Sequence, residues 1–137
     1  MVFQFQQKVL FKHCDPAGIV FYPRYLEMIN DCVEDFFDKE IGWPFEEILR
    51  SGGLPTVTTS TVFTAPSRHG DILDFTVRVE RLGKTSFDID VTVWCNKEQR
   101  LKNQSRLVRN GPSGRSQAWP EDIRQRLQEI LEKQNDN

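Results

Sequence analysis

The chain has 137 residues, a mass of 16.0 kDa and a formal net charge of −2, which is the size of a single domain over residues 1–137. No apolar run approaches the roughly 20 residues that span a bilayer, and no secretory signal opens the chain, so we expect a protein without a membrane segment. The near-neutral charge disfavours a dedicated nucleic-acid binder.

The N-terminal half begins with a predicted strand and a long predicted helix. Apolar and polar residues alternate over residues 2–12, which is typical of a half-buried strand. From Tyr22 the apolar residues recur every three or four positions over about four turns, which predicts an amphipathic helix. Pro23 suits the first turn of this helix, and Gly42 marks its end.

The second half is predicted to hold a short helix, four strands and a final helix. The short helix covers residues 43–50. Four segments have the alternation or the β-branched content of strands: 55–64, 72–81, 85–95 and 100–109. Gly83 and Lys84 suit a tight hairpin turn with glycine first. Pro120 opens an amphipathic helix, and we expect the polar residues from Gln134 onward to fray.

This order of elements predicts an α+β fold. Successive strands with short links form an antiparallel sheet, and the long helix must bury its wide apolar face against that sheet. We therefore expect a five-stranded antiparallel sheet wrapped around one long helix, with a C-terminal helix. Such a sheet leaves a free edge and spare apolar surface, so we expect the chain to dimerise.

The segment between the first strand and the long helix carries the most informative chemistry. Asp15 lies there on a predicted turn, next to a helix N-terminus with unpaired backbone N–H groups and a positive dipole. Such N–H groups polarise a carbonyl, and a facing carboxylate can attack that carbonyl or activate water. Asp15 to Gly18 also fits an ordinary type I turn, and this purely structural interpretation stays open here.

Other reactive groups are few. The sequence has two histidines, His13 and His69, and lacks the GxSxG, HExxH and glycine-rich phosphate-loop motifs. Its three cysteines, Cys14, Cys32 and Cys95, are widely spaced and include no CxxC pair. We therefore expect reduced thiols, no metal site and a cytoplasmic location.

The segment that contains Asp15 resembles the signature of a known family. Residues 15–25, DPAGIVFYPRY, are similar to the motif of the 4-hydroxybenzoyl-CoA thioesterase family of the hotdog superfamily, and the element order matches a hotdog fold over nearly the whole chain. The resemblance implies acyl-CoA thioester hydrolysis at the interface of a homodimer that pairs into a homotetramer. It implies that Asp15 is the catalytic carboxylate, as nucleophile or general base. It also implies that the backbone N–H of Tyr22 polarises the carbonyl, with Gly18 allowing close approach.

For the acyl group, the resemblance points to the middle of the long helix. The hydroxybenzoyl enzymes have an aspartate there that meets the phenol, whereas this sequence has Asn30. We therefore expect an aryl-CoA substrate without strict 4-hydroxybenzoyl specificity. The further candidates for the acyl pocket are Trp43, Phe45, Thr59 and Ser60, and plain core packing is the alternative for the two aromatic residues.

Coenzyme A is part of the substrate, so no separate cofactor is expected, but its phosphates require cations. Residues 97–115 hold six basic residues against one acid, whereas residues 24–50 hold eight acids against three bases. The candidates for phosphate contacts are Lys84, Thr85 and Arg115, followed by Arg81 and Arg109. Each exposed contact contributes about 1 kcal/mol or less.

Two other functions remain compatible with these residues. The same fold can hydrolyse short or medium aliphatic acyl-CoA, or acyl carrier protein thioesters. Alternatively, the protein is a non-catalytic acyl-CoA-binding module in which Asp15 only forms a turn. A hotdog hydratase is disfavoured because its His- and Asp-bearing motif is missing.

Overall fold

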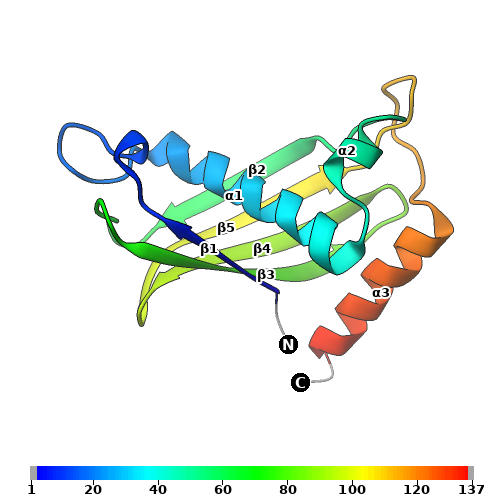
Figure 1. The fold of residues 1–137 in the computed structure, drawn as a ribbon. Helices are drawn as coiled ribbons and strands as arrows, with labels where there is room; N and C mark the ends of the chain where they lie inside the picture. Colours follow the sequence, from blue (N-terminus) through cyan, green and yellow to red (C-terminus); the bar gives the residue numbers. More distant parts are fainter. Residues whose placement is uncertain (1–2, 136–137) are drawn as a thin grey trace.

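The core of the molecule is a five-stranded antiparallel sheet with the strand order β1-β3-β4-β5-β2 (Figure 1). The computed structural model describes residues 3–135. The strands are β1 (Phe3–Lys8), β2 (Thr56–Phe63), β3 (Ile72–Leu82), β4 (Ser86–Cys95) and β5 (Glu98–Val108). The predicted five-stranded antiparallel sheet is confirmed, and β1 and β2 form its two edges.

The sheet curves around α1 (Tyr22–Phe36), which continues through one wider turn, Phe37–Ile41 (Figure 1). Gly42 ends this turn with a φ of +73°, as its position in the sequence predicts. The apolar face of α1 packs on the inner face of the sheet, and both faces are buried. The principal contributors are Met28, Ile29, Cys32, Phe36, Phe75, Phe87, Ile89, Val91 and Leu101. Burying a side chain of this size stabilises the fold by about 1.5–3 kcal/mol.

Two further helices complete the fold. The short helix α2 covers Phe45–Ile48, inside the predicted range 43–50. The C-terminal helix α3, Glu121–Asn135, packs beside β3 (Figure 1). Within residues 3–135, none of these helices has the length and apolar character needed to cross a bilayer.

The prediction that the chain frays from Gln134 is wrong for Gln134 itself. This residue belongs to α3, and its side chain is buried. Its amide donates to the carbonyl of Val79 at 2.8 Å and accepts from the N–H of Val79 at 3.0 Å. The two bonds tie the last turn of α3 to β3 at a β-bulge between Val79 and Arg81. Residues 136–137 lie outside the described residues.

The first strand is shorter than predicted. Residue 2 lies outside the described residues, and β1 ends at Lys8 rather than at residue 12. The N–H of Leu10 donates to Nδ1 of His13 at 2.8 Å, so the chain turns through one 3-10 turn, Phe11–His13. Phe11, expected on the buried face of the strand, is therefore 83% exposed.

The hairpin between β3 and β4 is tight, as predicted. The N–H of Gly83 donates to the carbonyl of Ser86 at 2.8 Å, so Lys84 and Thr85 form the loop. Gly83 is not among the residues with a positive φ. An added Cβ would lie 2.6 Å from Oγ of Ser86, so a larger residue would require this side chain to rotate away.

Candidate active site

The carboxylate of Asp15 is held by the loop that leads into α1. Its Oδ1 accepts hydrogen bonds from the N–H of Ala17 at 2.9 Å and from the N–H of Ile19 at 3.4 Å. The N–H of Asp15 donates to the carbonyl of Ile19 at 2.9 Å, which closes the loop. In the part of the chain that the structure describes, Oδ2 has no hydrogen-bond partner. The loop therefore presents an ordered, half-buried carboxylate with one oxygen available.

Gly18 completes the turn that contains this carboxylate. Its N–H donates to the carbonyl of Asp15 at 2.9 Å, and its φ is +79°, in the left-handed region that favours glycine. An added Cβ would meet no atom within 4 Å, so the backbone conformation rather than crowding within the chain favours glycine. Asp15 is thus a turn former through one oxygen, and the other remains free for chemistry.

The N-terminus of α1 lies next to this loop and is not capped by a side chain. Phe21 occupies the N-cap position, and its side chain makes no capping hydrogen bond. Arg24 donates its N–H to the carbonyl of Phe21 at 2.8 Å, and Pro23 has no N–H. Among residues 3–135, the N–H of Tyr22 has no acceptor, so it remains available at the positive end of the helix dipole.

An apolar cavity of about 360 Å³ adjoins Tyr22. It lies between the start of α1, the end of β2 and the loop that follows β2. Its lining residues are Ile19, Val20, Tyr22, Tyr25, Phe63, Thr64, Ala65 and Pro66. The ring centroid of Phe63 lies 6.3 Å from that of Tyr22 and 5.8 Å from that of Tyr25. The unpaired N–H of Tyr22 thus belongs to a residue that lines a space large enough for part of a ligand.

A buried network that the sequence analysis missed fixes the loop after β2. Ser67 is fully buried, and its Oγ accepts from the hydroxyl of Tyr25 at 2.7 Å and from Nη1 of Arg100 at 3.1 Å. Its carbonyl accepts from the N–H of Val20 at 2.9 Å, so this serine joins α1, β5 and the Asp15 loop. Arg100 also pairs with Asp71 at 2.8 Å.

Two pKa shifts follow from the surroundings of this network. Burial raises the pKa of the Tyr25 phenol, which therefore stays protonated and donates to Ser67. The N–H of Arg68, and then the guanidinium of Arg100, hold the pKa of Asp71 below its usual value. Asp71 and Arg100 therefore remain a charged pair at neutral pH.

A second cavity, of about 220 Å³, lies between α1 and the edge of the sheet formed by β2 and β5. Among its lining residues are Asn30 and Thr59, two of the predicted acyl contacts, together with Ser105. Ser60 does not line it, because consecutive strand residues point to opposite faces. Asn30 follows Tyr22 by eight residues, which is about 12 Å along the helix axis.

The remaining predicted acyl contacts lie near the other end of α1. Trp43 and Phe45 follow its C-terminus, about 22 Å from its start for a helix of 15 residues. The guanidinium of Arg109 lies 5.6 Å from the ring centroid of Trp43. The ring centroids of Phe45 and Phe37 lie 6.1 Å apart. One chain therefore does not bring these two aromatic residues next to Asp15.

The β3–β4 hairpin and the loop after β5, which carry the predicted phosphate contacts, lie at that same end (Figure 1). The carbonyl of Thr85 accepts from the N–H of Arg109 at 2.7 Å, and the carbonyl of Lys84 accepts from Trp119 at 3.3 Å. Arg115 is exposed on the loop after β5. Arg109 itself is buried and donates from Nη1 to the carbonyl of Ala118, so it is not a free phosphate contact.

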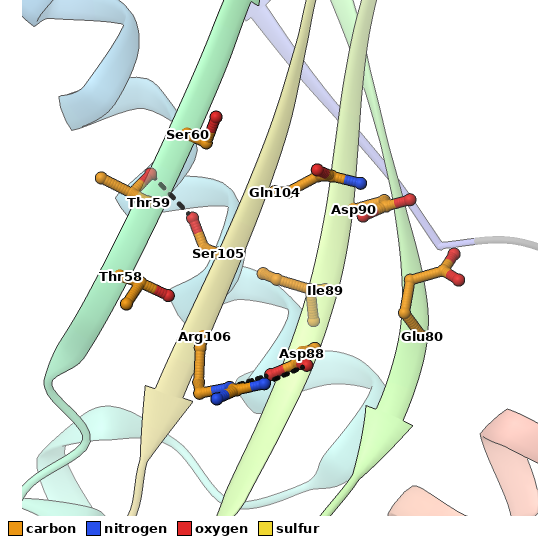
Figure 2. Close-up of a pocket in the computed structure, with 10 residues that line it drawn as sticks. All are labelled: Thr58, Thr59, Ser60, Glu80, Asp88, Ile89, Asp90, Gln104, Ser105 and Arg106. Atoms are coloured by element: carbon orange, nitrogen blue, oxygen red, sulfur yellow. Dashed lines mark hydrogen bonds and ion pairs between the residues drawn. The ribbon is translucent and has the colours of Figure 1, made fainter.

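Figure 2 shows a polar hollow of about 410 Å³ on the sheet, with α1 behind the strands. Arg106 forms a two-pronged ion pair with Asp88 there, with distances of 2.7 and 3.0 Å. This contact holds the pKa of Asp88 below its usual value. Asp90 adds a carboxylate that is unpaired within the described chain, and Glu80 adds one that pairs with Arg78 at 3.1 Å. The side chains that line the hollow therefore have an excess of negative charge, which disfavours the phosphates of CoA.

Other chemistry has little support in residues 3–135. No group of three His, Cys, Asp or Glu side chains is placed there to hold a metal ion. Burial raises the pKa of the Cys32 thiol to about 12, so this thiol is protonated at neutral pH. The Asp15 loop and the Tyr22 N–H remain the strongest candidate for a reactive centre.

Comparison with known proteins gives one family match and one related sequence. Residues 9–127 match the model of a family described as the thioesterase-like superfamily. A 4-hydroxybenzoyl-CoA thioesterase from Pseudomonas sp. (strain CBS-3) is 29% identical over 86 residues. The match spans 60% of this chain and 60% of the length of that protein.

Solved structures show the same arrangement of strands and helices. A 1,4-dihydroxy-2-naphthoyl-CoA thioesterase from Synechocystis superposes with a TM-score of 0.83, at 21% identity over 98% of each chain. A hypothetical protein from Staphylococcus aureus, solved in complex with CoA, gives a TM-score of 0.90 at 17% identity. That match covers 96% of this chain and 85% of the other. These likenesses confirm the predicted hotdog fold.

Proposed function

This chain belongs to the thioesterase-like superfamily, and on that premise we propose that it hydrolyses an aryl-CoA thioester, of the 4-hydroxybenzoyl-CoA kind, to the free acid and CoA. Two similar proteins act on aryl-CoA thioesters, one with a hydroxybenzoyl and one with a dihydroxynaphthoyl group. The observation that carries the proposal is the ordered Asp15 carboxylate, with Oδ2 free, on the loop that leads to the unpaired N–H of Tyr22.

In the proposed reaction, the N–H of Tyr22 donates to the thioester carbonyl oxygen and stabilises the negative charge that develops on it. Asp15 then acts in one of two ways. Its Oδ2 attacks the carbonyl carbon and expels the CoA thiolate, and water hydrolyses the resulting anhydride. Otherwise, Oδ2 takes a proton from a water molecule that attacks the carbonyl directly. A thiolate leaves readily, so neither route needs a strong general acid.

We further propose that the active site is shared between protomers of a homodimer, which pairs into a homotetramer. The 12 Å between Asn30 and Tyr22 along α1 exceeds the length of a benzoyl group. If the acyl group contacts Asn30 while its carbonyl contacts Tyr22, the two residues come from different chains. The same reasoning applies to Lys84, Thr85 and Arg115 as phosphate contacts, because they lie near the opposite end of α1 from Asp15.

The test follows thiol release from a panel of aryl- and alkyl-CoA thioesters. We expect turnover of aryl-CoA, and a loss of at least about 100-fold in kcat for Asp15→Asn, which keeps the acceptor for Ala17 but removes the base. Asp38→Asn is the matched control, since it makes the same charge change on the wide turn after α1. Unchanged activity in Asp15→Asn would remove Asp15 from its role.

Two alternatives have distinct outcomes in the same assay. Faster turnover of short or medium alkyl-CoA, or of acyl carrier protein thioesters, would replace the aryl group as the preferred substrate. Tight binding of acyl-CoA with no turnover of any thioester would indicate a binding module. Oδ1 of Asp15 accepts two hydrogen bonds within its own turn. This observation favours the second alternative, in which Asp15 only forms the turn.

We also propose that the protein is cytoplasmic. The three cysteines Cys14, Cys32 and Cys95 are all free, which fits a reducing compartment. Coenzyme A thioesters are soluble substrates, so the proposed reaction needs no membrane. Fractionation of cells that produce the protein would test this location.

A further inference from the structure

A polar cluster lies on the inner face of the sheet, among apolar side chains. Asn103 on β5 is completely buried, although the neighbouring inward positions on this strand are mostly apolar. Its side-chain amide donates to Oγ1 of Thr59 at 2.9 Å and to Oγ1 of Thr61 at 2.8 Å. Its Oδ1 accepts from the hydroxyl of Ser105 at 2.7 Å. All the hydrogen-bonding protons of this buried amide are therefore used.

The chemistry of these groups determines the direction of each hydrogen bond. Oδ1 of Asn103 can only accept, so Ser105 gives it the single proton of its hydroxyl. Thr59 must then be the donor in the 2.9 Å contact between its Oγ1 and Oγ of Ser105, which Figure 2 shows as a dashed line. Asn103, Thr59 and Ser105 thus form a closed ring in which both hydroxyl protons are committed.

This ring forms one wall of the 220 Å³ cavity, through Thr59 and Ser105. Each of the two hydroxyls keeps a lone pair but has no proton left to donate, so the wall offers acceptors alone. The other polar lining residues, Asn30 and Thr56, each carry both a donor and an acceptor and are exposed, so neither imposes a polarity of its own. The polarity of the cavity is therefore determined by the ring.

We propose that this cavity selects acyl groups that carry a hydrogen-bond donor, such as a ring hydroxyl or amine, and that Asn103 is the positioning residue that establishes this polarity. The proposal rests on the proposed thioesterase function. A substituent that can only accept would place its lone pairs against those of Thr59 and Ser105. Such a substituent would lose its hydrogen bonds to water without gaining one from the protein, which disfavours binding.

The experiment compares benzoyl-CoA derivatives in two pairs of similar size, substituted at ring position 3 or 4. The first pair is hydroxy and methyl, which differ in having a donor. The second pair is methoxy and ethyl, which differ in having an acceptor. For the wild-type protein we expect kcat/KM to favour hydroxy over methyl by about tenfold at one position, the effect of one hydrogen bond to a buried partner. We expect no preference for methoxy over ethyl.

Breaking the hydrogen-bonded ring should lower the kcat/KM ratio of hydroxy to methyl and raise the ratio of methoxy to ethyl. Asn103→Leu frees one hydroxyl proton of the Thr59–Ser105 pair, because the other stays in the contact between the two hydroxyls, so the hydroxy preference should fall to about threefold or less and a methoxy preference should appear. Ser105→Ala opens the ring on its other side and should act in the same direction. Thr61→Val is the matched control, since it removes one contact of Asn103 but leaves the ring closed. Each ratio is measured within one preparation, so a partly unfolded variant does not distort it.

The outcomes separate the two proposals. The role of Asn103 would be overturned if the wild-type protein showed no hydroxy preference at either position of the benzoyl group. It would also be overturned if both kcat/KM ratios were unchanged in Asn103→Leu and in Ser105→Ala. Absence of any thioester hydrolysis would instead overturn the proposed function. In that event the dissociation constants of the same four ligands, measured by calorimetry on the same variants, decide whether the ring sets donor selectivity in binding.

Discussion

At the scale of single residues, His13 determines how the chain enters the Asp15 loop. Its imidazole is 7% exposed, and Nδ1 accepts the N–H of Leu10, so the proton of the neutral ring is on Nε2. Burial, and then the charge of Lys12, lower the pKa of His13 below 6.5, although Glu27 raises it in part. Protonation would put a hydrogen on Nδ1 and break the contact with Leu10.

This geometry predicts a stability that depends on pH. Because the folded state disfavours the protonated imidazole, the unfolded state binds more protons below pH 6.5, so the free energy of unfolding should fall as the pH drops from about 7 to 5. His13→Asn removes the titrating group, and its urea-unfolding profile should be flatter over this range. His69→Asn, at an exposed position, is the control and should keep the wild-type slope. Equal slopes in wild-type protein and His13→Asn would contradict the assignment.

At the scale of elements, periodic burial could be predicted from the sequence, whereas ends set by distant contacts could not. The strand β4 alternates strictly between buried and half-buried residues, and α1 buries residues three and four apart. The bounds of β4, and of α1 together with the wide turn Phe37–Ile41, were therefore predicted within a residue or two. The end of β1 depends on the side chain of His13, and the end of α3 depends on a β-bulge 55 residues away at Val79. Neither contact leaves a periodic pattern.

The contact between Gln134 and Val79 should contribute measurably to stability. Gln134→Ala leaves the buried N–H and carbonyl of Val79 without their partners, so we expect a loss of about 1–3 kcal/mol in the free energy of unfolding. Gln128→Ala, on the exposed side of the same helix, is the matched control and should change stability by less than about 0.5 kcal/mol. Urea denaturation measures both, and equal losses would contradict the role of Gln134.

The candidate site divides in the same way. The Asp15 turn and the Tyr22 helix start are contiguous in sequence, so their arrangement could be predicted. The contacts of Ser67 with Tyr25 and Arg100, and those of Thr59 with Asn103 and Ser105, join residues that lie 33 to 46 positions apart. Each polar residue alone resembles a surface position of a strand or loop. The sheet register, which pairs Thr59 with Ser105 and Thr61 with Asn103, brings the residues of the Asn103 ring together. The packing of α1 and the loop after β2 brings Tyr25, Ser67 and Arg100 together.

At the scale of the whole molecule, half of the six basic residues in 97–115 are engaged in contacts within the chain. Within residues 97–115, Arg100 pairs with Asp71 and Arg106 pairs with Asp88. Arg109 is buried against Trp43. These arginines stabilise the fold, so fewer cations than the count of six remain available for a polyanionic ligand.

The free edge of the sheet is the feature most relevant to assembly. The strand β2 has no charged residue, pairs only with β5 in the described chain, and exposes 62% of Val62. Such an edge is a template for another strand. We expect the wild-type protein to sediment as a dimer or tetramer, Val62→Lys to shift it toward the monomer and lower turnover, and Val62→Thr to resemble the wild type. A stable, fully active wild-type monomer would contradict the shared site.

The missing side-chain cap at Phe21 bears on how substitution at this position would change the stability of α1. A serine, aspartate or asparagine at an N-cap typically adds about 1 kcal/mol to helix stability by satisfying the first N–H groups. At position 21 such a cap would accept from the N–H of Arg24, because Pro23 has no N–H, and it would leave the N–H of Tyr22 free for the proposed chemistry. The helix could therefore become more stable at this position without losing the donor that polarises the carbonyl.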